Sequence, residues 1–95
     1  MSVRPAQIVF VESDRRKVRV HTTRSVLESY SSLSDIAAVL PSNFVQCHKS
    51  FLINLSYVAE LGKTDIVTTT GETVPVSQRR HKATVEALAS NMRML

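Results

Sequence analysis

The sequence has little of what most enzyme and cofactor sites are built from. Its 95 residues include one cysteine, two glycines, three histidines and no tryptophan. With Gly62 and Gly71 alone, the chain cannot contain a GxGxxG, Walker A or GxSxG motif. The histidines are far apart, and with a single cysteine they offer no recognisable zinc framework. We therefore expect no enzymatic activity, no metal site and no cofactor.

Membrane and secretion signals are also missing. No apolar run approaches the ~18 to 20 residues that a membrane-spanning helix needs, and the segment before Ile8 lacks the apolar stretch of a secretory signal. Cys47 has no second cysteine with which to form an internal disulfide, as is usual in reducing compartments. These features predict a cytoplasmic domain that does not enter a membrane.

What is present is enough for one domain with one core. The chain is 43% hydrophobic with a mean hydropathy of -0.01, as in folded globular proteins. Residues 1–7 read as a linker or cut terminus, because Pro5 discourages regular structure. Residues 8–95 then form the domain.

The hydrophobic pattern predicts mostly short strands. Residues 8–11 are β-forming and apolar, and residues 17–21 alternate with a period of two, so the two segments should pair as a hairpin. Pro75 has no amide donor, so the last strand should lie at a sheet edge. Further strands are expected within residues 25–30, 44–54 and 57–61, and as a hairpin over 66–76 with its turn at Gly71-Glu72.

The stretch from Phe44 to Asn54 is apolar at both ends and polar in the middle. A buried strand does not normally carry a cation, so we expect the chain to turn out to the surface around His48 and Lys49 and to return to the core at Phe51. His48 is interpreted as a hydrogen-bonded structural histidine rather than a base or ligand, and Cys47 as a small core filler.

Two helices are predicted. Ser32 caps the first, whose apolar residues Leu33, Ile36 and Leu40 recur at helical spacing until Pro41. The second should begin near Gln78 with Ser77 as N-cap. Its apolar face is predicted to contain Val85, Leu88 and Met92.

Basic residues are concentrated in two clusters. Twelve Lys and Arg against eight Asp and Glu give a net charge of +4. One cluster is residues 15–17 and the other residues 79–82. Cations at a helix N-terminus are unfavourable by a few tenths to ~1 kcal/mol, so the second cluster suggests an anionic partner such as a phosphate. The alternative for each cluster is a solvated surface.

Three segments together resemble the LytTR-type DNA-binding domain of bacterial transcriptional regulators. They are F-x-x-x-H-K-S-F-L-I-N-L from Phe44 to Leu55 with Val58 behind it, T-G-E-x-V-P-V-S-x-R from Thr70 to Arg79, and the opening I-V-F-V-E from Ile8. The resemblance covers roughly residues 8–88. It implies a mostly β fold, an elongated arrangement of small antiparallel sheets with one or two short helices.

The resemblance also implies a function. Domains of this kind bind double-stranded DNA with loop residues, and typically form the output half of a two-component response regulator behind an N-terminal receiver. Their targets are imperfect direct repeats, on which we expect two copies of an otherwise monomeric domain. The alternative is a basic β module that binds an acidic protein or a membrane surface.

Residue by residue, the resemblance assigns base reading to Arg79 and to either Arg15 or Arg16, with guanine as the expected partner of Arg79. Lys lacks the fork of Arg, so Lys49 is assigned to a phosphate. Further phosphate contacts are expected from Lys17, Ser50, Arg80 and Lys82. Support of the contact loops is assigned to His48, Asn54 and Ser77.

Overall fold

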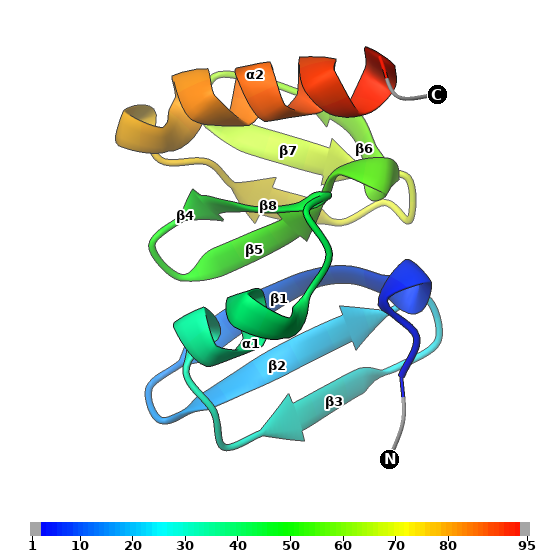
Figure 1. The fold of residues 1–95 in the computed structure, drawn as a ribbon, viewed down its shortest axis with the longest axis vertical. Coiled ribbons are helices and arrows are strands. Elements are labelled where there is room, and N and C mark those ends of the chain that lie inside the picture. Colours follow the sequence, from blue (N-terminus) through cyan, green and yellow to red (C-terminus); the bar gives the residue numbers. More distant parts are fainter. Residues whose placement is uncertain (1–2, 94–95) are drawn as a thin grey trace.

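Strand β1 (Ile8–Asp14) lies at the centre of a five-stranded antiparallel sheet. The computed structural model describes residues 3–93. β1 pairs on one side with β2 (Lys17–Thr22) and on the other with β5 (Phe51–Asn54). Its first four residues are all apolar and all buried, because Ile8 and Val11 pack in one apolar cluster and Val9 and Phe10 in another. β3 (Val26–Ser29) and β4 (Phe44–His48) complete the sheet in the order β3-β2-β1-β5-β4 (Figure 1). The predicted hairpin and third strand are confirmed.

A second, three-stranded antiparallel sheet has the order β6-β7-β8. Its strands are β6 (Val58–Leu61), β7 (Asp65–Thr68) and β8 (Thr73–Pro75), and Pro75 lies on an edge strand, as its missing amide predicts. Short 3-10 turns, η1 (Pro5–Gln7) and η2 (Leu55–Tyr57), precede β1 and β6. The mostly β fold class predicted from the sequence is confirmed.

Helix α1 (Leu33–Val39) covers part of the five-stranded sheet. The hydroxyl of Ser32 accepts a hydrogen bond from the Asp35 amide at 3.1 Å, which is the predicted N-cap. Leu33 packs with apolar side chains of β1, β2 and β5, and Ile36 and Leu40 lie at the margin of this cluster. The cluster is one of two apolar cores in the domain.

The other core joins the two sheets to helix α2 (Gln78–Arg93). Val9 and Phe10 of β1 and Ile53 of β5 pack with Ile66 and Val74 of the smaller sheet. Ala87 and Leu88 of α2 lie against this cluster, and α2 contacts β4 and η2. The sheets and α2 are stacked along the longest axis of the molecule, which measures 32 Å (Figure 1).

The predicted apolar face of α2 is partly wrong. Val85 is 41% exposed and Met92 is 63% exposed, whereas Thr84 is 1% exposed. A buried threonine is tolerated at this position because its hydroxyl donates to the Arg80 carbonyl at 2.7 Å, so no polar group is left without a partner. The buried side of the helix therefore runs through Thr84, Ala87 and Leu88.

Candidate nucleic-acid interface

Four connections of the chain lie at the same end of the strands, spaced along the longest axis of the molecule. They are the β1–β2, β4–β5 and β6–β7 turns and the junction between β8 and α2, on the left in Figure 1. Hydrogen bonds link them in series. The Ser13 amide donates to the Ser50 carbonyl at 2.8 Å, the Ser77 amide donates to the Cys47 carbonyl at 2.9 Å, and Nε2 of His81 lies 2.9 Å from the Gly62 carbonyl.

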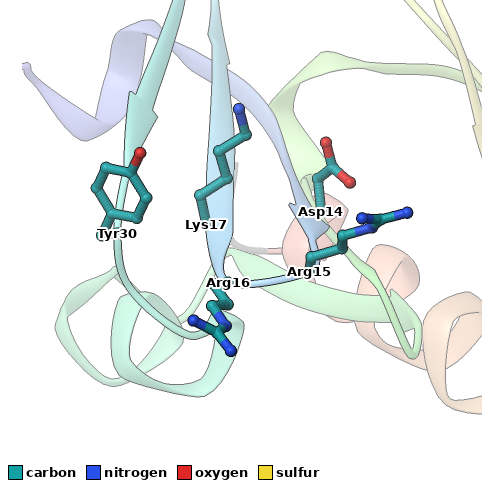
Figure 2. Close-up of a pocket in the computed structure, with 5 residues that line it drawn as sticks. All are labelled: Asp14, Arg15, Arg16, Lys17 and Tyr30. Carbon is teal, nitrogen blue, oxygen red and sulfur yellow. The ribbon is translucent and has the colours of Figure 1, made fainter.

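The β1–β2 turn presents two arginines. Asp14 pairs with Lys17 across the hairpin, so Arg15 and Arg16 alone form the loop, and both are exposed. Arg15 has a φ of 61°, a left-handed conformation that turns the chain within two residues. The two guanidinium groups extend in different directions from the tip (Figure 2).

Lys17 lies on β2 and belongs to a network of ion pairs. Its ammonium group lies 3.1 Å from the carboxylate of Glu28, and Arg19 lies 2.9 Å from Asp14 and 3.1 Å from Glu28. Hydrogen bonds from Lys17 first, and then from Arg19, hold the pKa of Glu28 below its ordinary value. Because its charge is compensated within the domain, Lys17 is the least available of the predicted phosphate contacts.

The β4–β5 turn places Lys49 and Ser50 between the two apolar strands, as the interrupted pattern predicts. Nδ1 of His48 accepts a hydrogen bond from the Ser50 amide at 3.1 Å, and the imidazole meets the ring of Phe51 edge-on at 5.5 Å. Gln46 donates to the Lys49 carbonyl at 3.2 Å. These contacts hold the turn, and the side chain of Lys49 remains exposed.

Asn54 fixes the far end of the same hairpin. Its side chain is 1% exposed and donates to the Ile8 carbonyl at 2.8 Å. Its Oδ1 accepts hydrogen bonds from the side chain of Asn43 at 2.8 Å and from the Ser56 amide at 2.9 Å. A single buried amide thus ties β1, the start of β4 and η2 together.

The N-terminus of α2 lies beside the β4–β5 turn. The helix begins at Gln78 as predicted, but Ser77 does not cap it with its side chain, because its buried Oγ has no hydrogen-bond partner within residues 3–93. Ser77 instead anchors the helix through its backbone, since its carbonyl accepts from the Arg80 amide at 3.1 Å. A cavity of about 470 Å3 separates helix and turn, lined by His48, Lys49, Ser77, Arg79, Arg80 and Ala83.

Lys82 faces a different cavity from Arg79. This cavity of about 540 Å3 lies between α2 and the β6–β7 turn, and it is also lined by Lys63 and His81. Lys63 escaped the sequence analysis because it is an isolated lysine outside both basic clusters. Its place directly after Gly62, between two predicted strands, is the signal that could have marked it as the tip of a turn.

Cys47, next to this end of the molecule, is a core residue. It is fully buried, and burial raises the pKa of its thiol to about 11. The thiol lies 3.5 Å from the Pro75 carbonyl, to which it donates. It therefore stays protonated at neutral pH and packs between β4 and the edge of the smaller sheet.

The turns together form a surface that can attract polyanions. We call it the basic end and define it by the exposed or partly exposed cations of the four connections. Because three hydrogen bonds link these connections, their positive charges add over one surface rather than being scattered. The residues of the basic end are Arg15, Arg16, Lys49, Lys63, Arg79, Arg80 and Lys82.

Comparison with known proteins identifies the family of this chain. A family model described as the LytTr DNA-binding domain matches residues 1–89. The chain belongs to the LytTr DNA-binding domain family. The sequence motifs from Phe44 to Leu55 and from Thr70 to Arg79 had indicated the same family, and that prediction is confirmed.

Similar proteins include bacterial regulatory proteins. The LytTr chain is 36% identical over 52 residues to the transcriptional regulatory protein NatR of Bacillus subtilis, covering 54% of this chain and 22% of NatR. It is 28% identical over 74 residues to an uncharacterized response regulatory protein of Yersinia pestis, covering 73% of this chain and 31% of that protein. The chain thus spans less than a third of the length of these curated relatives.

A solved structure shares the fold. It is the LytTr DNA-binding domain of a protein described as a methyl-accepting/DNA response regulator from Bacillus cereus, with a TM-score of 0.85 at 24% sequence identity. The match covers 93% of this chain and 86% of that one. Within the described residues, neither helix of this LytTr domain is long and apolar enough to cross a membrane.

Proposed function

We propose that this LytTr domain binds double-stranded DNA sequence-specifically through its basic end. Arg79 and one arginine of the β1–β2 turn read bases in successive major grooves, because an arginine fork can pair with two acceptors of guanine. Lys49, Ser50, Arg80 and Lys82 contact phosphates and fix the register, with Lys17 at the margin. The observation that carries the proposal is the linkage of four cation-bearing connections at one end of the molecule.

The size of the domain suits this mode of binding. Its longest extent is 32 Å, and the β1–β2 turn and the start of α2 are separated along that axis (Figure 1). One turn of B-DNA rises by about 34 Å. Turns spaced along such an axis can therefore meet neighbouring grooves on one side of a duplex without a recognition helix.

In its full-length protein, the domain acts as the output half of a response regulator in the bacterial cytoplasm. The regulatory proteins among its relatives, which are more than twice as long as this chain, support that role. An N-terminal receiver would supply the signal, and two copies would occupy imperfect direct repeats. In isolation the domain is monomeric, and it pairs on DNA.

Selection of binding sites from random duplex DNA at near-physiological salt tests the proposal. Recovery of a short motif, repeated at a spacing of about one helical turn, is the expected result. Salt-sensitive binding without any enriched sequence would contradict specific recognition and favour a basic module for an acidic protein or a membrane surface.

A further inference from the structure

Tyr30 is an unusually exposed aromatic residue at the basic end. Its side chain is 89% exposed, against 37% to 78% for the other exposed large apolar side chains within residues 3–92. It directly follows β3, whose last residue Ser29 pairs with Val18 of β2, so the topology places Tyr30 at the same end of the sheet as the β1–β2 turn. By contrast, Tyr57 is partly buried, and its hydroxyl donates to the Ala6 carbonyl.

An open cavity of about 790 Å3 lies between Tyr30 and the hairpin tip. Figure 2 shows Lys17 on β2, Arg16 at the hairpin tip and Tyr30 on the segment that directly follows β3, and all three line this cavity. Its other lining residues are Asp14 and Arg15.

The cavity keeps a net positive charge from the two arginines of the hairpin tip, because its other charged lining residues are paired within the domain. Lys17 is paired with Glu28, and Asp14 is paired with Arg19. Arg15 and Arg16 can therefore attract an anion to this position, and a neutral donor beside them can add a hydrogen bond without adding charge. A phenol hydroxyl is such a donor, and tyrosine is among the side chains that hydrogen-bond to DNA phosphates.

We propose that Tyr30 donates a hydrogen bond to a backbone phosphate at the flank of the DNA site, beyond the phosphates reached by the β1–β2 turn. The inference rests on the proposed function and extends its interface by one neutral contact. We assign the hydroxyl to a phosphate rather than the ring to stacking on a base. The bases of an intact duplex are already stacked on one another, and a single aromatic residue is not enough to bind an unpaired strand by stacking. Tyr30 thus lengthens the footprint without reading sequence.

The test compares Tyr30→Phe with wild type on the selected duplex and on duplexes shortened stepwise from either flank. Loss of one hydrogen bond to a charged group should weaken binding to the long duplex by about 10-fold or more. The same variant should match wild type once the contacted flank has been removed. Tyr57→Phe, the identical chemical change at an internally bonded tyrosine, is the control and should bind every duplex like wild type.

The salt dependence separates this contact from those of the cations. Tyr30→Phe should leave the slope of log affinity against log salt unchanged, whereas Lys82→Ala should reduce its magnitude by about 0.9. If Tyr30→Phe binds the long duplex as tightly as wild type does, the inference is overturned. This holds even if Tyr30→Ala weakens binding, because the ring and not the hydroxyl would then make the contact. The proposed function fails separately, if wild type shows no preferred sequence or if Arg79→Ala binds as wild type does.

Discussion

Single residues hold the β4–β5 hairpin from within the core. Asn54 supplies three hydrogen bonds from a side chain that is 1% exposed, and Cys47 fills the space between β4 and Pro75. Cys47 lies within β4 near the turn, and Asn54 lies at the other end of the hairpin. Together they hold the hairpin whose turn carries the exposed Lys49.

The buried thiol of Cys47 makes stability depend on alkaline pH. Burial raises its pKa from 9.0 to about 11, so the unfolded chain releases this proton before the folded chain does. The stabilising contribution is complete below pH 9.0 and is lost as the pH rises to about 11. Urea unfolding should show a larger fall in the free energy of unfolding over this interval for wild type than for Cys47→Ala. Equal falls would contradict the assignment.

Arg79 and Lys82 lie on α2 but face different cavities, which allows a matched comparison of two cations. Arg79→Ala should cost about 1 to 3 kcal/mol of specific binding and relax the preference at one base pair. Lys82→Ala should weaken binding to all sequences alike, because a phosphate carries no sequence information. Fluorescence anisotropy on the selected duplex and on a random duplex checks both, and an equal loss for Arg79→Ala on the two would remove it from base reading.

The roles of individual polar residues are only partly visible in the sequence. The interruption of an apolar pattern at residues 46–50 correctly predicts a turn around Lys49. The pairing of Lys17 with Glu28 was not predictable, since it depends on the register between β2 and β3. The sequence also could not show that Lys63 and Lys82 line the same cavity. Their proximity depends on the packing of the β6–β7 turn against α2, where His81 contacts the Gly62 carbonyl 19 residues away in the chain.

At the scale of secondary-structure elements, the β1–β2 hairpin is governed by its two-residue turn. Arg15 is the one non-glycine residue with positive φ within residues 3–93. A left-handed conformation costs a residue other than glycine about 1 to 2 kcal/mol, and a glycine at position 15 would remove this cost. A substitution by glycine also lowers the free energy of unfolding by about 0.4 to 1 kcal/mol, because glycine gives the unfolded chain more conformational freedom. The two effects oppose each other at Arg15, whereas only the second applies at Arg16.

Arg15→Gly and Arg16→Gly therefore form a pair with the same change in charge. Arg15→Gly should unfold with a free energy equal to or above that of wild type, and Arg16→Gly should be less stable by about 0.5 to 1 kcal/mol. Denaturant unfolding measures the difference, and the reverse order would contradict the turn geometry.

The binding of the two variants to the selected duplex also identifies which arginine reads a base.

Patterns of apolar residues predicted the positions of the strands and helices, but they predicted the buried face of α2 only in part. The strands and both helices follow from β-propensity, periodicity and the positions of Pro41 and Gly71. The buried face of α2 was misassigned because a threonine whose hydroxyl bonds to its own helix can replace an apolar residue in the core. Hydrophobic periodicity alone does not contain that information.

For the whole molecule, strand order decides which turns lie next to each other. β5 lies beside β1 although about 40 residues separate them in the chain, and this non-local pairing brings the β4–β5 turn next to the β1–β2 turn. Short-range sequence patterns do not specify such an order. The family resemblance predicted small antiparallel sheets, but it did not give their strand order.

The summed charge of the basic end predicts a strong dependence on salt. If about five phosphates are neutralised, log affinity should fall with log salt at a slope of about −4 to −5. Anisotropy titrations of wild type across a series of salt concentrations measure this slope. A flat response would contradict binding through the phosphate backbone.

Backbone amide chemical-shift mapping with the selected duplex tests the central claim most directly. The account predicts that shifts concentrate at residues 15–17, 49–50, 63 and 79–82, while the turns at residues 23–25 and 69–71, at the opposite end of the sheets, stay unperturbed (Figure 1). Shifts centred on that opposite end, or spread evenly over both ends, would contradict it.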